Sequence, residues 1–342
     1  MSMTKEFPAT EALASAAPHR STATWQWVLL VLVGIAIAVL PVFLLESFRL
    51  FQLTMAVIMA LAILGLNIVT GFNGQISLGH GAFYAVGAYT TAILVYHLEW
   101  SFWWTLPVSA VICATLGYGI GFPALRLGGL YLALTTFALA VAVPQLLKLN
   151  ALEHWTGGVQ GLFILKPEPP AGVALTPDQW MYLVALGISG VLFLLAWNLV
   201  RSRIGRALMA TRDHPTAAEA MGMDTASLKT RAFAASALIT GIAGSLSAAV
   251  VEFVAPDSFT IFVSITLFVG MVAGGVASIL GSVFGGLFVL FVPNIAEAIS
   301  KSAPGVIYGV ILILFLFLLP DGFAGLLRRI AARIIRPHNG AS

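Results

Sequence analysis

Charged side chains are scarce in this sequence. Only 17 basic and 14 acidic residues occur among 342, so charged residues make up 9% and hydrophobic residues 59%. A typical soluble domain carries about 25% charged residues. A water-soluble fold of this length needs a charged surface, and so few charges cannot cover one. The composition therefore excludes an ordinary soluble protein and indicates that lipid surrounds most of the chain.

Several motifs that support chemistry are also missing. Cys113 is the only cysteine, so no intrachain disulfide can form. None of the five lysines follows a glycine, which rules out the Gly-x-x-x-x-Gly-Lys loop that surrounds phosphates. No Gly-x-Ser-x-Gly elbow is present, and His80 has no Cys, Asp or Glu at metal-ligand spacing. We therefore expect no enzyme activity, nucleotide hydrolysis, metal or cofactor in this chain.

What the sequence does contain is a series of long apolar segments. A helix needs about 20 largely uncharged residues to cross a bilayer. Because the runs are continuous rather than alternating, they predict an all-α integral membrane protein instead of a β-barrel. Ten such segments are expected, at 27–45, 50–70, 81–98, 102–122, 127–147, 180–200, 232–251, 259–280, 283–300 and 305–319. The eighth and ninth are two full helices or a re-entrant pair.

The basic residues predict the orientation of these segments. If both termini lie in the cytoplasm, 13 of the 17 Lys and Arg residues fall on the inner side, as the positive-inside rule requires. The scatter of these residues over short connections also argues against nucleic-acid binding. The predicted organisation is a disordered cytoplasmic tail at 1–24, a transmembrane domain at 25–320 and a basic cytoplasmic tail at 321–342.

Two connections in the transmembrane domain are long. The outer connection, 148–179, contains a Thr-Gly-Gly sequence and several prolines, which predict an irregular loop. The inner connection, 201–231, predicts two short polar helices broken at 213–215, with Thr216 capping the second helix and Gly222 ending it. We call the inner connection the elbow.

The segment at 65–81 is the most unusual part of the chain. Five glycines and six polar side chains lie there between two apolar spans. Non-helical backbone at membrane depth requires protein or a water-filled cavity around it, so a broken helix beside a solute pathway is one interpretation. A tight cytoplasmic turn with helix-packing glycines is the other. Glycines also interrupt the apolar run at 280–285, and paired interruptions of this kind mark the two halves of some transporters.

Four stretches together resemble one family. They are residues 67–87, the Pro-Ala-Leu-Arg-Leu-Gly-Gly-Leu-Tyr run at 123–131, the Thr-Gly-Gly run at 156–162 and Ser-Arg-Ile-Gly-Arg-Ala-Leu at 202–208. In this order they resemble the LivM-type (LivH/LivM) permease family of branched-chain amino acid ABC importers. The resemblance extends over about residues 50–319.

The resemblance implies partners and roles for residues. The expected partners are a second homologous permease, two ATPase subunits that hold ATP and Mg²⁺, an extracytoplasmic substrate-binding protein and the bilayer of the bacterial cytoplasmic (inner) membrane. Alternating access, driven by the ATPases, is the implied mechanism. The implied pathway residues are Asn67, Asn73, Gln75, Ser77 and His80. The implied ATPase-coupling residues are Arg206, Glu219, Ala220 and Gly222, and the implied docking loop for the binding protein contains Thr156, Gly157 and Gly158.

Two alternatives remain open at this stage. A related permease for urea, short amides or other amino acids would have much the same membrane sequence, because in this family the outer binding protein largely selects the cargo. A stand-alone secondary transporter or channel would move its solute without an ATPase.

Overall fold

The structure is a computed structural model that describes residues 34, 36, 38–124, 129–301 and 303–335. The chain divides into two units, 1–45 and 46–342. In the first unit the described part contains the short helix α2 (Pro41–Leu44). The predicted tail at 1–24 lies outside the described residues, as do residues 27–33, 35 and 37 of the first predicted span at 27–45.

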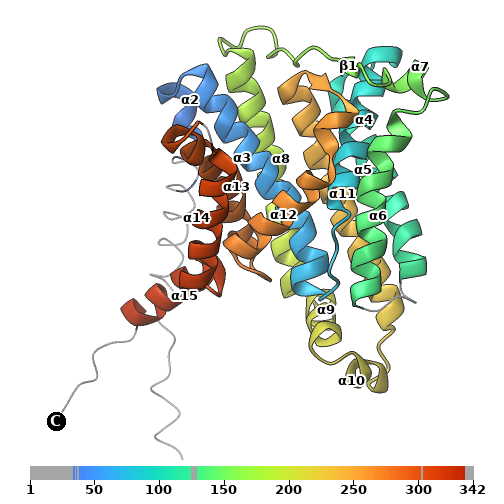
Figure 1. The fold of residues 1–342 in the computed structure, drawn as a ribbon, viewed down its shortest axis with the longest axis vertical. Helices are drawn as coiled ribbons and strands as arrows, with labels where there is room; N and C mark the ends of the chain where they lie inside the picture. The colour runs from blue at the N-terminus through green and yellow to red at the C-terminus, as the bar shows by residue number, and fades with distance from the viewer. Residues whose placement is uncertain (1–33, 35, 37, 125–128, 302, 336–342) are drawn as a thin grey trace, which may run out of the picture. The chain divides into compact units, whose positions relative to one another are not determined.

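The second unit is helical almost throughout (Figure 1). Its elements in chain order are α3 (Ser47–Leu66), the π-helix η1 (Asn67–Phe72), α4 (His80–Leu98), α5 (Phe102–Ala124), α6 (Leu130–Leu147), α7 (Glu153–Thr156), β1 (Leu162–Phe163), α8 (Pro177–Arg201), α9 (Arg203–Asp213), α10 (Pro215–Ala220), α11 (Thr225–Val251), β2 (Phe253–Val254), the 3-10 helix η2 (Pro256–Phe259), α12 (Ile261–Gly274), α13 (Ile279–Ile299), α14 (Pro304–Leu318) and α15 (Gly322–Ile335).

Six helical segments of the described chain are long and apolar enough to cross a bilayer. They are α3 with η1, α5, α8, α11, η2 with α12, and α13. The bent pair α14 and α15 would add a seventh. The predicted spans at 81–98 and 127–147 do form helices, α4 and α6, although these fall short of the same criteria. An all-α membrane fold is therefore confirmed.

Two of these segments form the interior of the unit. Some 78% of the most apolar stretch of α3 with η1 is buried, and 72% of that of α11, against 22–39% for the other four segments. Glycines allow the close packing of α11 on α4. A Cβ at Gly87 would lie 2.0 Å from the Gly241 carbonyl oxygen, and one at Gly244 would lie 2.0 Å from that of Tyr84. Small residues of this kind commonly let membrane helices approach each other.

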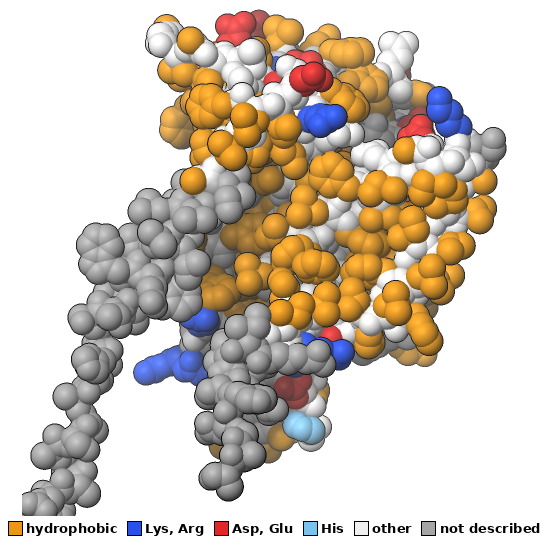
Figure 2. Space-filling view, turned by 90° about the vertical axis from the view of Figure 1, so that its left-hand side faces the viewer, with side chains coloured by type: hydrophobic (Ala, Val, Ile, Leu, Met, Phe, Trp, Pro, Cys, Tyr) orange, Lys and Arg blue, Asp and Glu red, His pale blue; other side chains and the backbone are white. Residues whose placement is uncertain are grey.

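The outer surface is apolar between its two charged ends. Figure 2 shows hydrophobic side chains across the middle of the visible face, with Lys, Arg, Asp and Glu near the top and bottom. The helix α14 has no buried residue within its described part, and Phe317 on it is 85% exposed. Such a surface suits contact with lipid or another apolar helix.

The elbow and the outer loop lie at opposite ends of the second unit (Figure 1). Helices α9 and α10 are at one end, whereas α7 and β1 are at the other. The helix predicted over 259–280 is shorter than expected, because α12 ends at Gly274. Gly275 has φ +124° and Ala277 has φ +56°, and neither angle fits an α-helix. The backbone is therefore broken twice, at 73–79 and at 275–278.

Candidate functional site

The first break follows the π-helix η1. The Val69 carbonyl accepts a hydrogen bond from the Gln75 amide at 3.0 Å, and the Gln75 carbonyl accepts one from the Thr70 hydroxyl at 2.9 Å. Gly74 lies between them with φ +74°, a backbone angle that glycine adopts without strain. The glycines and polar side chains of this segment thus form a compact connection into α4 that satisfies several of its own backbone groups.

Asn67 joins the first break to the second. Its Oδ1 accepts a hydrogen bond from the Ala277 amide at 2.8 Å. Its Nδ2 donates to the Ser278 carbonyl at 2.9 Å and to Ser282 Oγ at 3.2 Å, and lies 3.4 Å from the Gly275 carbonyl oxygen. The side chain is fully buried. A single carboxamide therefore supplies partners for a non-helical segment more than 200 positions away.

His80 stands at the start of α4 in a chain of three polar contacts. Ser236 Oγ donates to the Gly65 carbonyl at 2.5 Å, so its only proton is already used. The 2.5 Å contact between Ser236 Oγ and His80 Nε2 must then be donated by the imidazole. This assigns the Nε2–H tautomer, and the Ser77 hydroxyl donates to Nδ1 at 3.0 Å. His80 and Ser77 therefore hold α4 against α11 and α3.

The remaining two predicted pathway residues, Asn73 and Gln75, have surroundings that differ from those of Asn67, Ser77 and His80. Gln75 is half-buried, whereas Asn73 is 2% exposed. Neither Nδ2 nor Oδ1 of Asn73 has a hydrogen-bond partner among the described residues. The structure thus brings all five predicted residues into one region, with Asn67, Ser77 and His80 engaged inside the chain. Their pathway role stays a prediction.

Sequence reasoning missed the partners of these residues. Thr136 on α6 accepts a hydrogen bond from the Leu78 amide at 3.0 Å, and Ser264 on α12 accepts one from the Gly81 amide at 2.9 Å. Ser236 and Ser282 were missed in the same way. A lone hydroxyl in an apolar helix gives no signal, because it also satisfies itself on its own helix. Only the glycine-rich segment itself was visible in the sequence.

The elbow consists of two short helices, as the sequence predicted. Ser202 caps α9, with its Oγ accepting from the Ile204 amide at 3.1 Å and the Gly205 amide at 3.4 Å. The prediction that Thr216 caps the second helix was wrong. Helix α10 begins earlier, at Pro215, because proline suits the first helical position and its missing amide needs no partner there.

The four predicted coupling residues all lie on the elbow. Glu219 and Ala220 are exposed on α10, and Glu219 Oε1 accepts a hydrogen bond from the Thr225 hydroxyl at 2.7 Å. Gly222 follows with φ +81°, which turns the chain toward α11. Arg206 is exposed on α9 and donates to the Arg201 carbonyl at 3.1 Å. The structure places them around one exposed end of the unit, and their coupling role stays a prediction.

One further residue of the elbow reaches the first break. Arg212, in the last turn of α9, donates from Nη1 to the Gly71 carbonyl oxygen at 2.9 Å. Its Nε donates to Asp213 Oδ1 at 2.8 Å. Nothing in the sequence distinguished Arg212 from the other cytoplasmic arginines.

The outer loop is folded more tightly than its composition suggested. Thr156 and Gly158 are buried, and the Thr156 hydroxyl lies 2.8 Å from the Leu147 carbonyl oxygen. Gly157 has φ +72°, and a Cβ there would lie 2.2 Å from the Gly161 carbonyl oxygen. The three predicted docking residues therefore form the less exposed part of this turn. The exposed surface is formed by neighbours such as Val159, which is 65% exposed.

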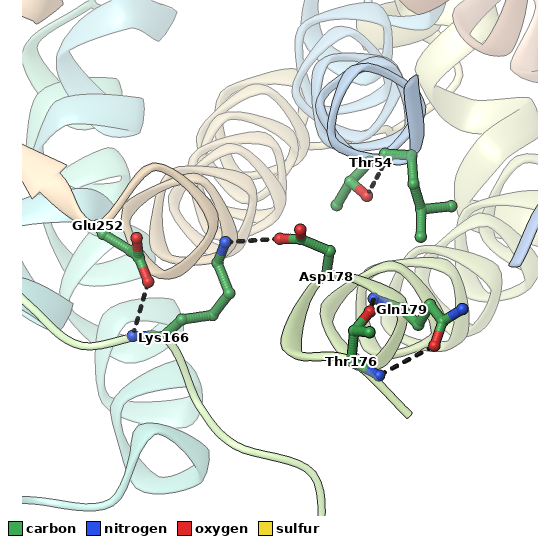
Figure 3. A network of polar contacts seen from close by, with 7 residues as sticks. Thr54, Lys166, Thr176, Asp178, Gln179 and Glu252 are labelled. Carbon is green, nitrogen blue, oxygen red and sulfur yellow. Dashed lines mark hydrogen bonds and ion pairs between the residues drawn. The ribbon is translucent and has the colours of Figure 1, made fainter. Parts of the chain in front are cut away.

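A polar network fastens the loop to the helices (Figure 3). Lys166 Nζ lies 2.8 Å from Oδ1 of Asp178, which stands in the first turn of α8. The Lys166 amide donates a hydrogen bond of 3.2 Å to Oε1 of Glu252, the residue that follows α11. Strand β1 pairs with β2 in antiparallel register, Leu162 with Val254. The sequence did not predict this pairing, because two-residue strands are too short to show a periodic pattern. The loop is therefore anchored to α8 and α11.

The described residues contain no group of three His, Cys, Asp or Glu side chains that could hold a metal ion. What they do define is a polytopic α-helical membrane protein with two broken helices at its centre and a two-helix elbow at one end. Residues 48–319 match the family model described as branched-chain amino acid transport system / permease component. Because the match covers more than half of the chain, the protein belongs to this family, and the resemblance inferred from its motifs is confirmed.

Curated relatives agree with the family. The chain is 36% identical over 249 residues to the high-affinity branched-chain amino acid transport system permease protein LivM of Salmonella typhimurium, covering 66% of this chain and 58% of LivM. Identity to LivM of Escherichia coli is 35% over the same length and the same shares. BraD of Pseudomonas aeruginosa, a permease protein of the same description, is 25% identical over 297 residues, covering 80% of this chain and 93% of BraD. The chain thus spans under two thirds of the LivM length.

Proposed function

We propose that this chain is the permease subunit of an ATP-driven importer for branched-chain or related amino acids. The family match over 48–319 is the observation that carries the proposal. The names of the LivM and BraD relatives, which are branched-chain amino acid transport permeases, supply the cargo class. The elbow adds physical support, since it offers a separate ATPase a structured, exposed element attached directly to two apolar helices, α8 and α11.

The proposed topology has about ten spans in the bacterial cytoplasmic membrane, with both termini in the cytoplasm. The helices α4 and α6 would count among these spans, and the broken pair α12 and α13 as the eighth and ninth. The concentration of Lys and Arg at the elbow end supports this orientation. In this arrangement the outer loop, with its folded turn at Thr156, faces the extracytoplasmic binding protein.

The proposed mechanism is alternating access. Two partner ATPases, which hold ATP and Mg²⁺, close and push the elbow around Arg206, Glu219, Ala220 and Gly222. A second, homologous permease completes the pathway. Because Asn67, Ser77 and His80 are engaged within this chain, cargo would meet the first break around the exposed residues Gly74 and Ile76, where half-buried Gln75 is the most accessible of the five predicted pathway residues. Urea, short amides or other amino acids remain alternative cargoes.

The test is uptake into proteoliposomes that contain this chain with the proposed second permease and ATPases, and the proposed binding protein outside. We expect ATP-dependent accumulation of leucine, isoleucine or valine and none without ATP. Uptake without the ATPases would overturn the proposal in favour of a stand-alone carrier. Uptake of urea or short amides alone would assign the other cargo class.

The coupling role is tested on α10. Glu219→Lys removes the acceptor of the Thr225 hydroxyl and reverses the charge, and Gly222→Val places a branched side chain at φ +81°. Both variants should lose ATP-dependent uptake yet insert in normal amounts. Thr216→Ala, an exposed position on the same helix, is the matched control. Normal uptake in both variants would refute the coupling role.

A further inference from the structure

The contact between Arg212 and Gly71 joins the elbow to the first break. The last carbonyl groups of a helix lack partners within it and carry partial negative charge, so a cation nearby is favourable. Gly71 is the penultimate residue of η1, and its carbonyl oxygen lies 2.9 Å from Arg212 Nη1. Asp213 holds the other edge of the guanidinium at Nε, 2.8 Å away. The guanidinium is therefore fixed on both sides.

Close packing makes this connection stiff. A Cβ at Gly74 would lie 2.5 Å from Arg212 Cγ and 3.3 Å from Arg212 Cβ. A Cβ at Gly71 would lie 1.9 Å from Asn67 Oδ1 and 2.6 Å from the Ala277 amide nitrogen. Arg212, Gly71, Asn67 and Ala277 thus form an unbroken line of contacts from the elbow through η1, which leads directly into the first break, to the second break. Tightly packed contacts of this kind transmit displacement rather than absorb it.

The segment next to this line contains a group that the present arrangement leaves unsatisfied. Asn73 lies between Gly71 and Gly74, is 2% exposed and finds no partner for its carboxamide among the described residues. Buried polar groups normally have partners, and an exception calls for an explanation. A displacement of residues 73–79 would give this carboxamide the opportunity to gain a partner.

We propose that Arg212 is the positioning residue that makes α9 and η1 move as one body, so that a push on the elbow displaces the first break. The proposal rests on the proposed function, because it assigns the route by which the elbow acts on the membrane helices. Arg212 does not touch cargo or nucleotide. It acts through the Gly71 carbonyl and through the contacts that Gly71 makes with Asn67 and Ala277.

The first experiment compares Arg212→Ala and Arg212→Lys with Arg203→Ala in the reconstituted importer. Arg203 is exposed on the same helix, and its side chain has no hydrogen bond or ion pair with any described residue. Arg212→Ala should lower the amount of cargo moved per ATP hydrolysed at least tenfold while ATPase activity stays within twofold. Arg212→Lys, which keeps a cation but not the fork of donors, should retain an intermediate ratio. An unchanged ratio in Arg212→Ala, equal to that of Arg203→Ala, would overturn the proposal.

A second experiment does not depend on the stability of the alanine variant. The Cβ atoms of two disulfide-bonded cysteines lie about 3.8 Å apart, and a Cβ at Gly74 would lie 3.3 Å from Arg212 Cβ. The double variant Gly74→Cys with Arg212→Cys can therefore form a disulfide in place of the lost hydrogen bond of Arg212. The same protein is measured reduced and oxidised. Oxidation should restore coupled uptake that the reduced form lacks. A failure to restore it, with the disulfide shown to be formed, would show that fixing α9 to the first break does not couple the elbow to the membrane helices. Absence of ATP-dependent uptake in the unmodified importer would instead refute the proposed function.

Discussion

Replacing Asn67 with alanine removes the contact that ties the two broken helices together. The substitution deletes the oxygen that accepts a hydrogen bond from the Ala277 amide. It also deletes the amide group that donates to the Ser278 carbonyl and to the Ser282 hydroxyl. The Ser278 carbonyl keeps the Ser282 amide as a partner at 3.2 Å. The Ala277 amide keeps none among the described residues, and Ala277 must hold φ +56° without it.

The expected cost follows from these contacts. Interhelical hydrogen bonds in membrane proteins are worth about 0.6 kcal/mol on average and about 1.7 kcal/mol at most. Asn67 has four polar atoms within 3.4 Å, three on the second break and one on Ser282 in the first turn of α13, which gives about 2.4 kcal/mol. The emptied space beside Gly71 adds about 1 kcal/mol. The total, about 2–4 kcal/mol, corresponds to a fall of about 4–8 °C in the unfolding midpoint at about 2 °C per kcal/mol.

The measurement is thermal unfolding of the purified chain in detergent, followed by tryptophan fluorescence. Thr54→Ala is the matched control, because Thr54 is 2% exposed on α3 but its hydroxyl bonds, among the described residues, only to the Leu50 carbonyl of its own helix, at 2.8 Å. Its midpoint should stay within about 2 °C of the unmodified chain, since the lost bond is worth less than about 1 kcal/mol. If Asn67→Ala unfolds at the same temperature as Thr54→Ala, the two breaks are not held by this carboxamide.

Two further predictions concern packing and orientation. Gly87→Ala should destabilise the chain by about 1–3 kcal/mol, because its Cβ would meet the Gly241 carbonyl at 2.0 Å, whereas Gly119→Ala meets nothing within 4 Å and should be neutral. Equal unfolding midpoints would refute the close approach of α4 and α11. A membrane-impermeant thiol reagent should label Ala174→Cys in intact cells but label Ala217→Cys only after lysis, since both positions are exposed and the single native cysteine is buried. Labelling of both, or of Ala217→Cys alone, would break the proposed topology.

The division between sequence and structure is clearest at the two breaks. The glycines and polar side chains at 65–81 indicated an interruption there, either a broken helix or a tight turn, because no continuous span of that composition is stable in lipid without partners. The second break was placed too late in the chain, since the apolar run through Gly274 continues without a change in hydropathy. The positive φ angles of Gly275 and Ala277 arise from contacts with Asn67 and with neighbouring helices, and hydropathy does not record such contacts.

The sequence by itself determined that lipid surrounds the chain, that its spans are helical and that the elbow holds two short helices broken near residues 213–215, because each follows from local composition and apolar runs must be helical in lipid. It did not determine the exact start of the second elbow helix, which lies at Pro215. The tertiary structure decided which polar groups meet. Asn67 with Ser282, His80 with Ser236 and Arg212 with Gly71 are pairs separated by more than 140 positions. No local pattern encodes such pairs, since a buried hydroxyl or carbonyl gains its partner only when helices pack.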